Sequence, residues 1–332
     1  MNPKVSIIVP VYNTVRYLES CIDSLKKIDF KLFEVIFIDN HSSDGSYEIL
    51  KNIDKKNFKV YRNNKNFGQS YSLNRAISLS KSPFIAIMDS DDICLPNRIK
   101  DSYDFLRKNK NYALVAGCSD TINENGDILA RRRFTLEFEL VKTRILIDNP
   151  ISHTTVMFRK KILKKTGGYS KKLNFTQDYD LISKIILRGY KVKVLNKKFT
   201  LVRKHRKQQS HLFKQQQLNE RFHISCNNFN HKLKLDKYFK NLIEYLIFNK
   251  SKNFEKFSLN KKGVILENFL NKTFNKDEEK LYFCSLIFSR NNKFEKYFRF
   301  KFLIRYLLKN NLFIVKREIF LRTIMSFIKV IF

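Results

Sequence analysis

The chain has 332 residues, 43% of them hydrophobic, which is enough to bury a sizeable core and excludes a wholly disordered chain. Lys and Arg outnumber Asp and Glu by 65 to 31 and give a formal net charge of +34. Such a surplus predicts an anionic partner: nucleic acid, a phosphorylated ligand or an anionic membrane surface. The 5 cysteines are widely spaced without a CxxC pair, so we expect buried thiols in a reducing compartment. The first apolar run, at 5–11, is too short for a signal peptide, and no apolar run of about 18 residues occurs. A cytoplasmic location is therefore expected.

The first 120 residues alternate strand signals with helix signals. Five stretches rich in apolar residues predict strands at 5–11, 33–39, 58–63, 84–89 and 112–118. Capping residues and apolar residues at helical spacing predict helices between these strands. This alternation is typical of an α/β fold with a mostly parallel sheet flanked by helices, in which ligands bind at the carboxyl ends of the strands.

The pattern becomes mixed after residue 120. It predicts, in chain order, a hairpin turn at 123–127, a helix at 136–148, a strand at 153–159, a helix at 178–189 and two short strands at 191–196 and 199–205. Beyond about residue 208 the sequence has the pattern of helices rich in Phe, Lys and Asn. We therefore expect an α/β domain over 1–210 and a basic, Phe-rich, mainly α-helical extension over 211–332.

Three acids, Asp89, Asp91 and Asp92, follow the predicted strand 84–89 at its carboxyl end. Carboxylates crowded there are costly unless positive charge lies among them. One interpretation is that Asp92 and its neighbours cap the next helix. The other, which fits best, is a divalent cation that bridges a diphosphate, because Mg²⁺ or Mn²⁺ binds one or two carboxylates together with phosphate oxygens.

Four stretches have the order and spacing of one known family: VSIIVPVYNT, FEVIFIDNHSSDGSYEIL, NKNFGQSYSLNRAISLSKSPFIAIMDSDDICLPNRI and GGYSKKLNFTQDYDLISKI. Together they resemble the family 2 glycosyltransferases of the GT-A (Rossmann-like) fold over residues 4–210. The resemblance implies an inverting, metal-dependent enzyme with Mn²⁺ or Mg²⁺ as cofactor. It would move a sugar from a nucleotide-diphosphate donor, a UDP-sugar, to a saccharide or lipid-linked acceptor in bacterial surface polysaccharide synthesis.

The resemblance also implies a set of donor-binding residues. They are Pro10, Tyr12, Asn13, Asp39, Gly68, Asn74, Arg75, Asp89, Arg203 and His205. Asp39 matches an acid that accepts a hydrogen bond from a uracil-type base, with helix capping as its alternative role. Arg75 would face either phosphate or solvent, and Asp44 matches a position with a structural capping role. The family often has a second acid and then a glycine where this chain has Asn40 and His41, which leaves the identity of the base open.

The metal and the leaving group are assigned by the same resemblance. Asp91 would coordinate the cation directly, and Asp89 would contact the ribose and the metal. Arg203 and His205 would lie beside the diphosphate, where cations stabilise the charge of a leaving group. By residue type alone, His205 is more often a surface or core histidine. His153 has an acceptor-side or diphosphate role as one alternative and a structural role as the other.

The catalytic base is expected in the helix at 178–189. At about 100° per residue, Asp178 falls in the middle of the apolar face, whereas Asp180 falls beside Lys184 as an i,i+4 partner. The family places its catalytic Asp at the position of Asp178, after a Glu that is Gln177 here. We therefore expect Asp178 to be the base, with helix capping as its alternative role.

Two other classes of protein remain as alternatives. A sugar-phosphate nucleotidyltransferase would need a glycine-rich, Arg-containing turn after the first strand, and none occurs between Val11 and Phe30. A basic nucleic-acid-binding protein would agree with the charge, but its acids lie where such a protein would be basic, so no nucleic acid is expected as partner. The tail at 293–332, which is rich in Lys, Arg and Phe, either packs as a helical cap or binds an anionic membrane surface on the inner face of the plasma membrane.

Overall fold

The computed structural model describes residues 2–131, 138–206, 208–231, 237–248, 259–274, 279–280 and 283. The chain folds into two compact units. The first contains Met1–Phe138 and Asn149–Lys214, and the second contains Glu139–Asp148 and Gln215–Phe332. A short segment, Glu139–Asp148, thus interrupts the first unit along the chain and belongs to the second.

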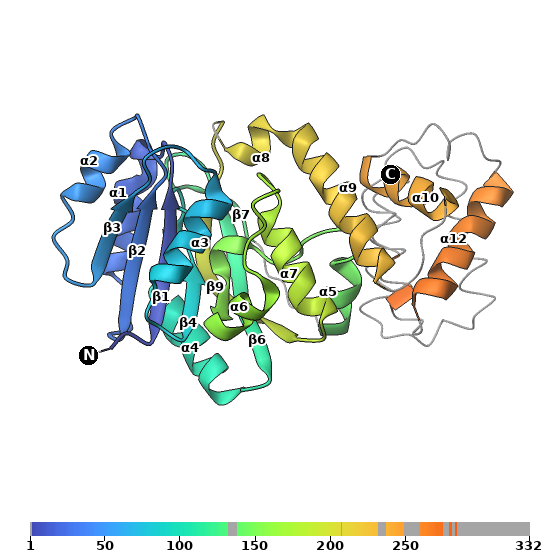
Figure 1. The fold of residues 1–332 in the computed structure, drawn as a ribbon, viewed down its shortest axis with the longest axis horizontal. Coiled ribbons are helices and arrows are strands. Elements are labelled where there is room, and N and C mark those ends of the chain that lie inside the picture. The colour runs from blue at the N-terminus through green and yellow to red at the C-terminus, as the bar shows by residue number, and fades with distance from the viewer. Residues whose placement is uncertain are drawn as a thin grey trace. The chain divides into compact units, whose positions relative to one another are not determined.

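The described part of the first unit is built on a nine-stranded sheet (Figure 1). In chain order its strands are β1 (Val5–Val11), β2 (Phe33–Asp39), β3 (Phe58–Arg62), β4 (Phe84–Ile87), β5 (Ile93–Cys94), β6 (Tyr112–Ile122), β7 (Ile128–Ala130), β8 (Met157–Arg159) and β9 (Lys191–Arg203). Their spatial order is β3-β2-β1-β4-β8-β6-β9-β5, and β7 pairs with β6. Strands β3, β2, β1 and β4 are mutually parallel, and β6 is parallel to β9.

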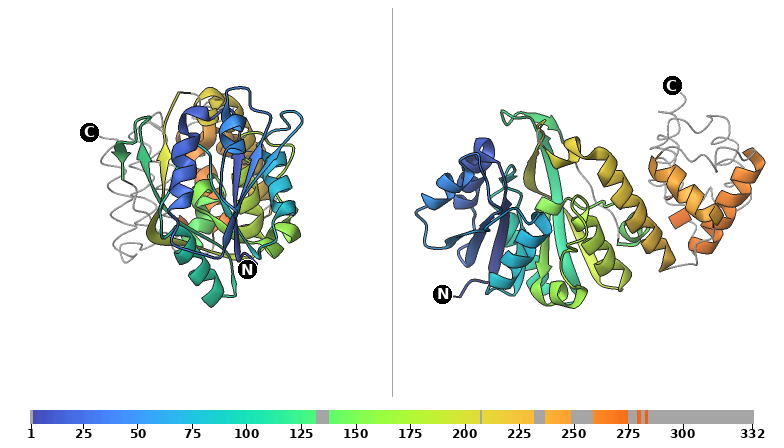
Figure 2. Two further views of the ribbon diagram at one scale, coloured as in Figure 1. Left: turned by 90° about the vertical axis from the view of Figure 1, so that its left-hand side faces the viewer. Right: turned by 45° about the horizontal axis from the view of Figure 1, so that its top comes forward.

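Helices lie on both faces of this sheet (Figure 2). They are α1 (Val15–Lys26), α2 (Ser46–Lys51), α3 (Gln69–Leu79), α4 (Arg98–Lys108), α6 (Lys160–Thr166), α7 (Gln177–Leu187) and α8 (Gln209–Leu212). Strands β1 and β2 are buried along their whole length, as expected for nearly continuous apolar strands that are covered on both faces. In α1, Leu18, Cys21, Ile22 and Leu25 recur at helical spacing and pack into the same core.

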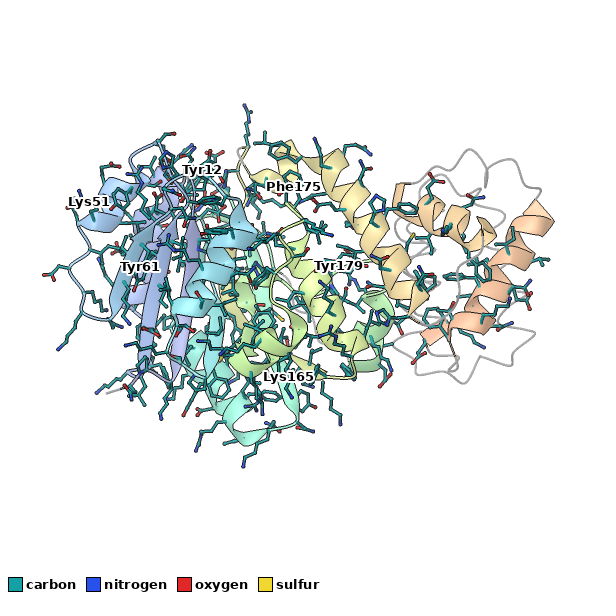
Figure 3. All side chains as sticks on the ribbon, viewed as in Figure 1. Tyr12, Lys51, Tyr61, Lys165, Phe175 and Tyr179 are labelled. Carbon is teal, nitrogen blue, oxygen red and sulfur yellow. The ribbon has the colours of Figure 1, made fainter. Side chains whose placement is uncertain are left out.

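Six strands, β1, β2, β3, β4, β6 and β9, run in one direction, so their carboxyl ends meet at one side of the sheet, here named the carboxyl edge. Strand β8 runs the other way, and the short 3₁₀ helix η1 (His153–Thr155) that precedes it therefore lies at the same edge. Figure 3 shows Tyr12 and Phe175 near this edge and Lys165 at the opposite one. The fold brings residues from distant parts of the sequence together at the carboxyl edge.

The strands differ from the expectation in three places. The strand expected at 153–159 begins only at Met157, because His153–Thr155 form η1. The short strands expected at 191–196 and 199–205 are one continuous strand, β9, in which three exposed residues interrupt the apolar pattern. Strand β5 was not expected, because it has only two residues and exists through its pairing with β9. The hairpin turn is confirmed, since Gly126 adopts a φ of 99° and the amide of Asn123 donates to the carbonyl of Asp127 at 2.9 Å.

The second unit is helical where it is described, as predicted. Its helices are α5 (Phe138–Arg144), α9 (Lys214–Asn230), α10 (Lys237–Phe248) and α12 (Leu259–Thr273). Its core contains the buried rings of Phe229, Phe239, Phe269, Phe274 and Phe283. Ser225 and Asn228 of α9 donate hydrogen bonds of 2.5 and 2.8 Å to the carbonyls of Leu146 and Ile145. Helix α5 ends at Arg144, so these two carbonyls lie just beyond it, and the bonds from α9 give them hydrogen-bond donors.

The predicted membrane-binding tail at 293–332 lies outside the described residues. Within the ranges that the structure covers, no helix is both long enough and apolar enough to cross a bilayer.

Candidate active site

Asp39 ends β2, and its side chain is fully buried at the carboxyl edge. Arg62, its register partner in β3, forms an ion pair with it, with 3.0 Å between Nε and Oδ2. The amide of Ser42 donates to both carboxylate oxygens at 3.2 and 3.3 Å. Because Ser42 precedes α2, Asp39 is not the cap of that helix. The ion pair and the amide both stabilise the ionised carboxylate.

Replacement of Arg62 by Met is expected to leave the Asp39 carboxylate buried without its counter-charge. We expect the free energy of unfolding to fall by about 1–3 kcal/mol, the usual cost of a buried polar group that loses its partner. Urea denaturation measures this change. Arg107→Met, on an exposed position of α4, is the matched control and should change the value by less than about 0.5 kcal/mol. Equal effects of the two substitutions would contradict the assigned role of Arg62.

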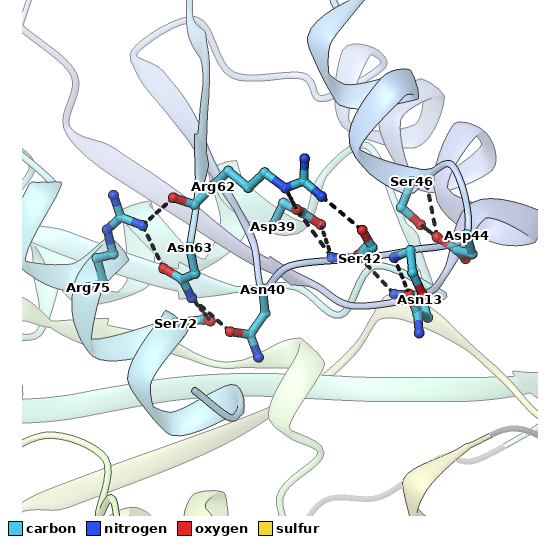
Figure 4. A network of polar contacts seen from close by, with 11 residues as sticks. Asn13, Asp39, Asn40, Ser42, Asp44, Ser46, Arg62, Asn63, Ser72 and Arg75 are labelled. Atoms are coloured by element: carbon cyan, nitrogen blue, oxygen red, sulfur yellow. Dashed lines mark hydrogen bonds and ion pairs between the residues drawn. The ribbon is translucent and has the colours of Figure 1, made fainter. Parts of the chain in front are cut away.

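Amide side chains form a network beside Asp39 (Figure 4). The Oδ1 atom of Asn40 accepts a hydrogen bond of 2.8 Å from Asn63. Arg75 donates to Asn63 Oδ1 at 2.6 Å and to the carbonyl of Arg62 at 2.8 Å. The Arg75 guanidinium thus contacts its own chain in this structure, and its contact with donor phosphate stays a prediction.

The turn after β1 contains one exposed aromatic side chain and one strained residue. Pro10 is buried within β1, so the turn begins after it. Tyr12 is 43% exposed. Asn13 has a φ of 52°, a left-handed conformation that asparagine tolerates. Its amide donates to the hydroxyl of Ser42 at 3.0 Å, and its Oδ1 accepts from the amide of Ser43 at 2.9 Å. These bonds join the turn after β1 to the turn after β2 (Figure 4).

Asp44 has the structural role that was predicted for it. Its carboxylate accepts hydrogen bonds from the amide of Val15 at 2.9 Å and from the amide and hydroxyl of Ser46 at 3.0 and 2.6 Å. It therefore caps the first turns of both α1 and α2. Partial burial raises the pKa of Asp44, but these hydrogen bonds outweigh the burial and lower the pKa below its usual value.

Two further predicted donor residues lie in and before α3. Gly68 precedes the helix with a φ of 83°, and its amide donates to Asn66 Oδ1 at 2.9 Å. Asn74 makes a double hydrogen bond with the backbone of Tyr169: its Nδ2 donates to the carbonyl at 2.8 Å, and its Oδ1 accepts from the amide at 3.0 Å. Asn74 thus joins α3 to the loop that leads to α7.

Asp89 follows β4 at the carboxyl edge. Its amide donates to Thr154 Oγ1 at 3.3 Å, and its Oδ1, which is buried, has no hydrogen-bond partner among the described residues. The Nδ1 atom of His153 lies 4.0 Å from this oxygen. Burial, opposed by the nearby His153 and reinforced by the charges of Asp91 and Asp178, raises the pKa of Asp89 to about 6.

This raised pKa predicts a pH dependence with a definite sign. An unfolded Asp has a pKa of about 3.9, so from about pH 4 to about pH 6 the native state binds more protons at Asp89 than the unfolded state does. The contribution of Asp89 to the free energy of unfolding therefore falls as the pH rises through this window. In the presence of chelator, the stability of Asp89→Asn relative to the wild type should increase over the same window. A difference that urea denaturation shows to be constant with pH would contradict the prediction.

Asp92 is not the cap of the following helix. Helix α4 begins at Arg98 after the N-cap residue Asn97, whose side chain makes no capping hydrogen bond. Asp92 is instead 2% exposed and accepts a 2.9 Å hydrogen bond from the amide of Arg203 at the end of β9. Burial, with the charges of Asp91 and Asp89 added, raises its pKa well above the usual value. Its role in this structure is to join the acidic turn to β9.

Asp91 pairs with His205 across the same edge. Their Oδ2 and Nε2 atoms are 3.0 Å apart, and the imidazole packs against the ring of Tyr17 with 4.7 Å between centroids. Both side chains are mostly covered, at 19% and 8% exposed for Asp91 and His205. His205 is therefore held beside Asp91, with one oxygen and one nitrogen ligand close together.

The Arg203 guanidinium is almost fully buried, at 4% exposed. It donates to the carbonyls of Asp91 at 3.0 Å, Asn123 at 3.2 Å and Glu124 at 2.8 Å, and to the hydroxyl of Ser20 at 3.3 Å. These bonds join the acidic turn, the end of β6 and α1. Its contact with a leaving diphosphate stays a prediction, since the observed partners all belong to the chain.

Helix α7 places its two acids as the periodicity predicted. Its apolar face, Leu181, Ile182, Ile185 and Ile186, is buried. Asp180 binds Lys184 with 2.5 Å between Oδ2 and Nζ. Asp178 lies in the first turn, where Asn149 donates to its Oδ2 at 2.8 Å. The charge of Asp178 also raises the pKa of Asp89.

Comparisons with known proteins agree with this arrangement. The sequence model of Glycosyl transferase family 2 matches residues 6–167. An uncharacterized glycosyltransferase of Methanocaldococcus jannaschii is 31% identical over 198 residues, which cover 58% of this chain and 68% of the relative. An O-antigen biosynthesis glycosyltransferase of Escherichia coli is 31% identical over 188 residues, which cover 55% of this chain and 71% of the relative. The chain belongs to glycosyltransferase family 2. The predicted enzyme class is therefore confirmed, in place of the nucleotidyltransferase and nucleic-acid-binding alternatives.

Solved structures show the same fold. TarS of S. aureus, residues 1–349 in complex with UDP-GlcNAc, superimposes with a TM-score of 0.58 at 22% identity and covers 86% of each chain. A mannosyltransferase from Pyrobaculum calidifontis in complex with GDP-Man and Mn²⁺ superimposes with a TM-score of 0.55 at 14% identity, over 99% of this chain and 86% of that one. The predicted GT-A fold class is confirmed.

The carboxyl edge of this family 2 glycosyltransferase has residues that fit a divalent cation. Asp91 and His205 offer adjacent oxygen and nitrogen ligands, and the buried Oδ1 of Asp89 lacks a partner among the described residues. The described residues contain no group of three or more His, Cys, Asp and Glu side chains arranged to hold a metal by themselves. A cation that keeps free positions for phosphate oxygens needs only one or two carboxylates from the protein, and the residues present fit that requirement.

Two arginines at this edge were missed from the sequence. Arg62 pairs with Asp39. Arg98 is 1% exposed, and its guanidinium donates to the carbonyls of Ile87 and Val156, at the ends of β4 and η1. In the sequence, Arg62 ends a strand and Arg98 begins a helix among many other basic residues. The pairing of β2 with β3 places the partly exposed Arg62 beside Asp39, and the fold buries Arg98 against the end of β4.

Proposed function

We propose that this family 2 glycosyltransferase is an inverting, metal-dependent enzyme that moves a sugar from a UDP-sugar to a saccharide or lipid-linked acceptor. The observation that carries the proposal is the placement of Asp39, Asp89, Asp91 and His205 at the carboxyl ends of β2, β4 and β9, with Asp178 near enough for its charge to raise the pKa of Asp89. The O-antigen relative supports a role in bacterial surface polysaccharide synthesis, and the complexes of solved structures with UDP-GlcNAc and GDP-Man support a nucleotide-sugar donor.

The donor would lie along the carboxyl edge. Asp39, ionised beside Arg62, would accept a hydrogen bond from the base, and the exposed ring of Tyr12 would contact the nucleotide. Asp89 would contact the ribose, and Asp91 with His205 would hold the cation at the diphosphate. A bound Mn²⁺ or Mg²⁺ would offset the negative charge that develops on the departing diphosphate.

Asp178 would take the proton from the acceptor hydroxyl. The hydroxyl oxygen forms a bond to the anomeric carbon from the face opposite the diphosphate, while the bond from that carbon to the diphosphate oxygen breaks. The electron pair of the broken bond leaves with the nucleoside diphosphate, and the anomeric configuration is inverted. Asn149, which donates to Asp178 Oδ2, would hold the carboxylate toward the acceptor.

A panel of UDP- and GDP-sugars, scored for nucleotide release with Mn²⁺ and after chelation, tests this proposal. We expect release from one or more UDP-sugars, an increase on addition of the correct acceptor, and loss of release after chelation. Release from GDP-sugars alone would overturn the assignment of the base, and release that survives chelation would overturn the metal-dependent mechanism.

A further inference from the structure

Tyr169 and His153 form a buried pair within the candidate active site. The Tyr169 hydroxyl and His153 Nε2 are 2.8 Å apart, and the rings meet edge to face, with centroids 5.5 Å apart at 79°. Tyr169 is 2% exposed, and the His153 side chain is 10% exposed. Neither contact was expected from the sequence, since the residues come from the loop before α7 and from η1.

The direction of this hydrogen bond follows from the groups present. Among the described residues, His153 is the hydrogen-bond partner of the Tyr169 hydroxyl. Burial, together with the charges of Asp178 and Asp89, raises the pKa of Tyr169 well above its usual value, so the hydroxyl keeps its proton. A carboxylate oxygen faces Nδ1 on the other side of the ring, and an acceptor there favours a hydrogen on Nδ1 and leaves Nε2 to accept from the hydroxyl. Nε2 of His153 is then the acceptor, and a neutral imidazole carries its hydrogen on Nδ1. Nδ1 is the nitrogen that lies 4.0 Å from Asp89 Oδ1.

The backbone of Tyr169 is fixed on its other side. Asn74 binds both the amide and the carbonyl of Tyr169. The preceding residue, Gly168, has a φ of 68°, and a Cβ atom there would come within 2.6 Å of Asn74 Oδ1. Glycine is therefore required for this close approach. The phenol is presented to His153 from a backbone that cannot shift without losing two hydrogen bonds.

The far side of His153 faces an oxygen that needs a donor. Asp89 Oδ1 is buried without a hydrogen-bond partner among the described residues, and a buried acceptor in that state is costly. The neighbouring Thr154, also in η1, accepts a hydrogen bond from the Asp89 amide, so η1 contacts both the backbone and the side chain of Asp89. An Nδ1–H of His153 would direct the positive end of its dipole at this oxygen across the 4.0 Å between the two atoms.

We propose that Tyr169 is a positioning residue that acts through His153: its hydroxyl holds the imidazole with Nδ1–H directed at Asp89 and so orients the acid that contacts the donor. The part of the proposal that concerns donor binding rests on the proposed function. The tautomer of His153 does not depend on any substrate. The two parts can therefore be tested separately.

The first test measures the dissociation constant of UDP in the presence of Mn²⁺ by calorimetry across a double-mutant cycle. We expect Tyr169→Phe to weaken binding about 3- to 10-fold, the range of one lost hydrogen bond, and His153→Ala to weaken it by at least as much. In the His153→Ala background, Tyr169→Phe should add no further loss. Tyr103→Phe, whose ring packs against Phe30 and Phe84, is the matched control and should bind UDP as the wild type does. Additive losses from Tyr169→Phe and His153→Ala would overturn the proposal.

The second test reads the tautomer of the substrate-free protein by ¹⁵N NMR of labelled histidine. The resonances of His153 are identified by their loss in His153→Ala. We expect a protonated Nδ1 and an unprotonated Nε2 in the wild type, and a shift toward protonated Nε2 in Tyr169→Phe. A protonated Nε2 in the wild type would overturn the proposal. If UDP does not bind the wild type, the proposed function fails, whereas the tautomer still decides whether Tyr169 sets the state of His153.

Discussion

Asp178→Asn is expected to bind the donor and the cation as the wild type does but to lose turnover by about 10²- to 10⁴-fold, the usual contribution of a general base. The amide retains the size of the carboxylate but cannot accept a proton. Because Asn149 donates to Asp178 Oδ2, the side chain should keep its place when the amide is oriented with its oxygen toward Asn149. Steady-state kinetics with a UDP-sugar and acceptor, together with calorimetric titration of UDP, separates turnover from binding.

Asp180→Asn is the matched control for this change. Asp180 is two positions away on the same helix but is paired with Lys184, an i,i+4 contact that contributes about 0.2–0.5 kcal/mol. We expect turnover within about twofold of the wild type. Near-native turnover in Asp178→Asn would contradict its role as the base. If Asp180→Asn were inactive while Asp178→Asn stayed active, the faces of α7 would be assigned wrongly.

The second large effect is expected from Asp91→Ala. The substitution removes the carboxylate that pairs with His205 and leaves the neighbouring hydrogen bond between Asp92 and Arg203 intact. We expect transfer to fall below detection and UDP binding to lose its dependence on Mn²⁺. Thermal unfolding without metal should stay close to that of the wild type.

Asp23→Ala is the matched control, because it removes a carboxylate that is not expected to bind the cation. Asp23 contacts Lys26 in a solvent-exposed i,i+3 pair, and its removal should leave activity and Mn²⁺ dependence unchanged. Persistent turnover in Asp91→Ala would contradict the assigned role of Asp91. Unchanged Mn²⁺ dependence in that variant would place the cation elsewhere.

The sequence was most informative where short-range patterns determine structure. The nearly continuous apolar runs at 5–11 and 33–39 predicted strands β1 and β2 at the observed residues. The helical period that placed Asp178 on the apolar face and Asp180 beside Lys184 matches α7. In each case neighbours along the chain carry the information, through the alternation of strands and the 3.6-residue period of helices.

Long-range contacts could not be predicted in the same way. The unexpected β5 exists only because β9 lies beside it. Asp92 is of a residue type that often caps helices, but its hydrogen-bond partner is the amide of Arg203, 111 positions away. The role of Arg203 is likewise determined by carbonyls from two separate segments and by the hydroxyl of Ser20 in a third. A single sequence indicates that these residues are charged, but which group they meet depends on the order of the strands.

The most direct test of the central claim is the position of Mn²⁺ in crystals grown with UDP, located by its anomalous scattering. The account predicts one strong peak within about 2.5 Å of an Asp91 carboxylate oxygen and of a diphosphate oxygen, the range of a coordinating bond to a hard cation. UDP bound at the carboxyl edge without such a peak, or a peak remote from Asp91, would contradict it.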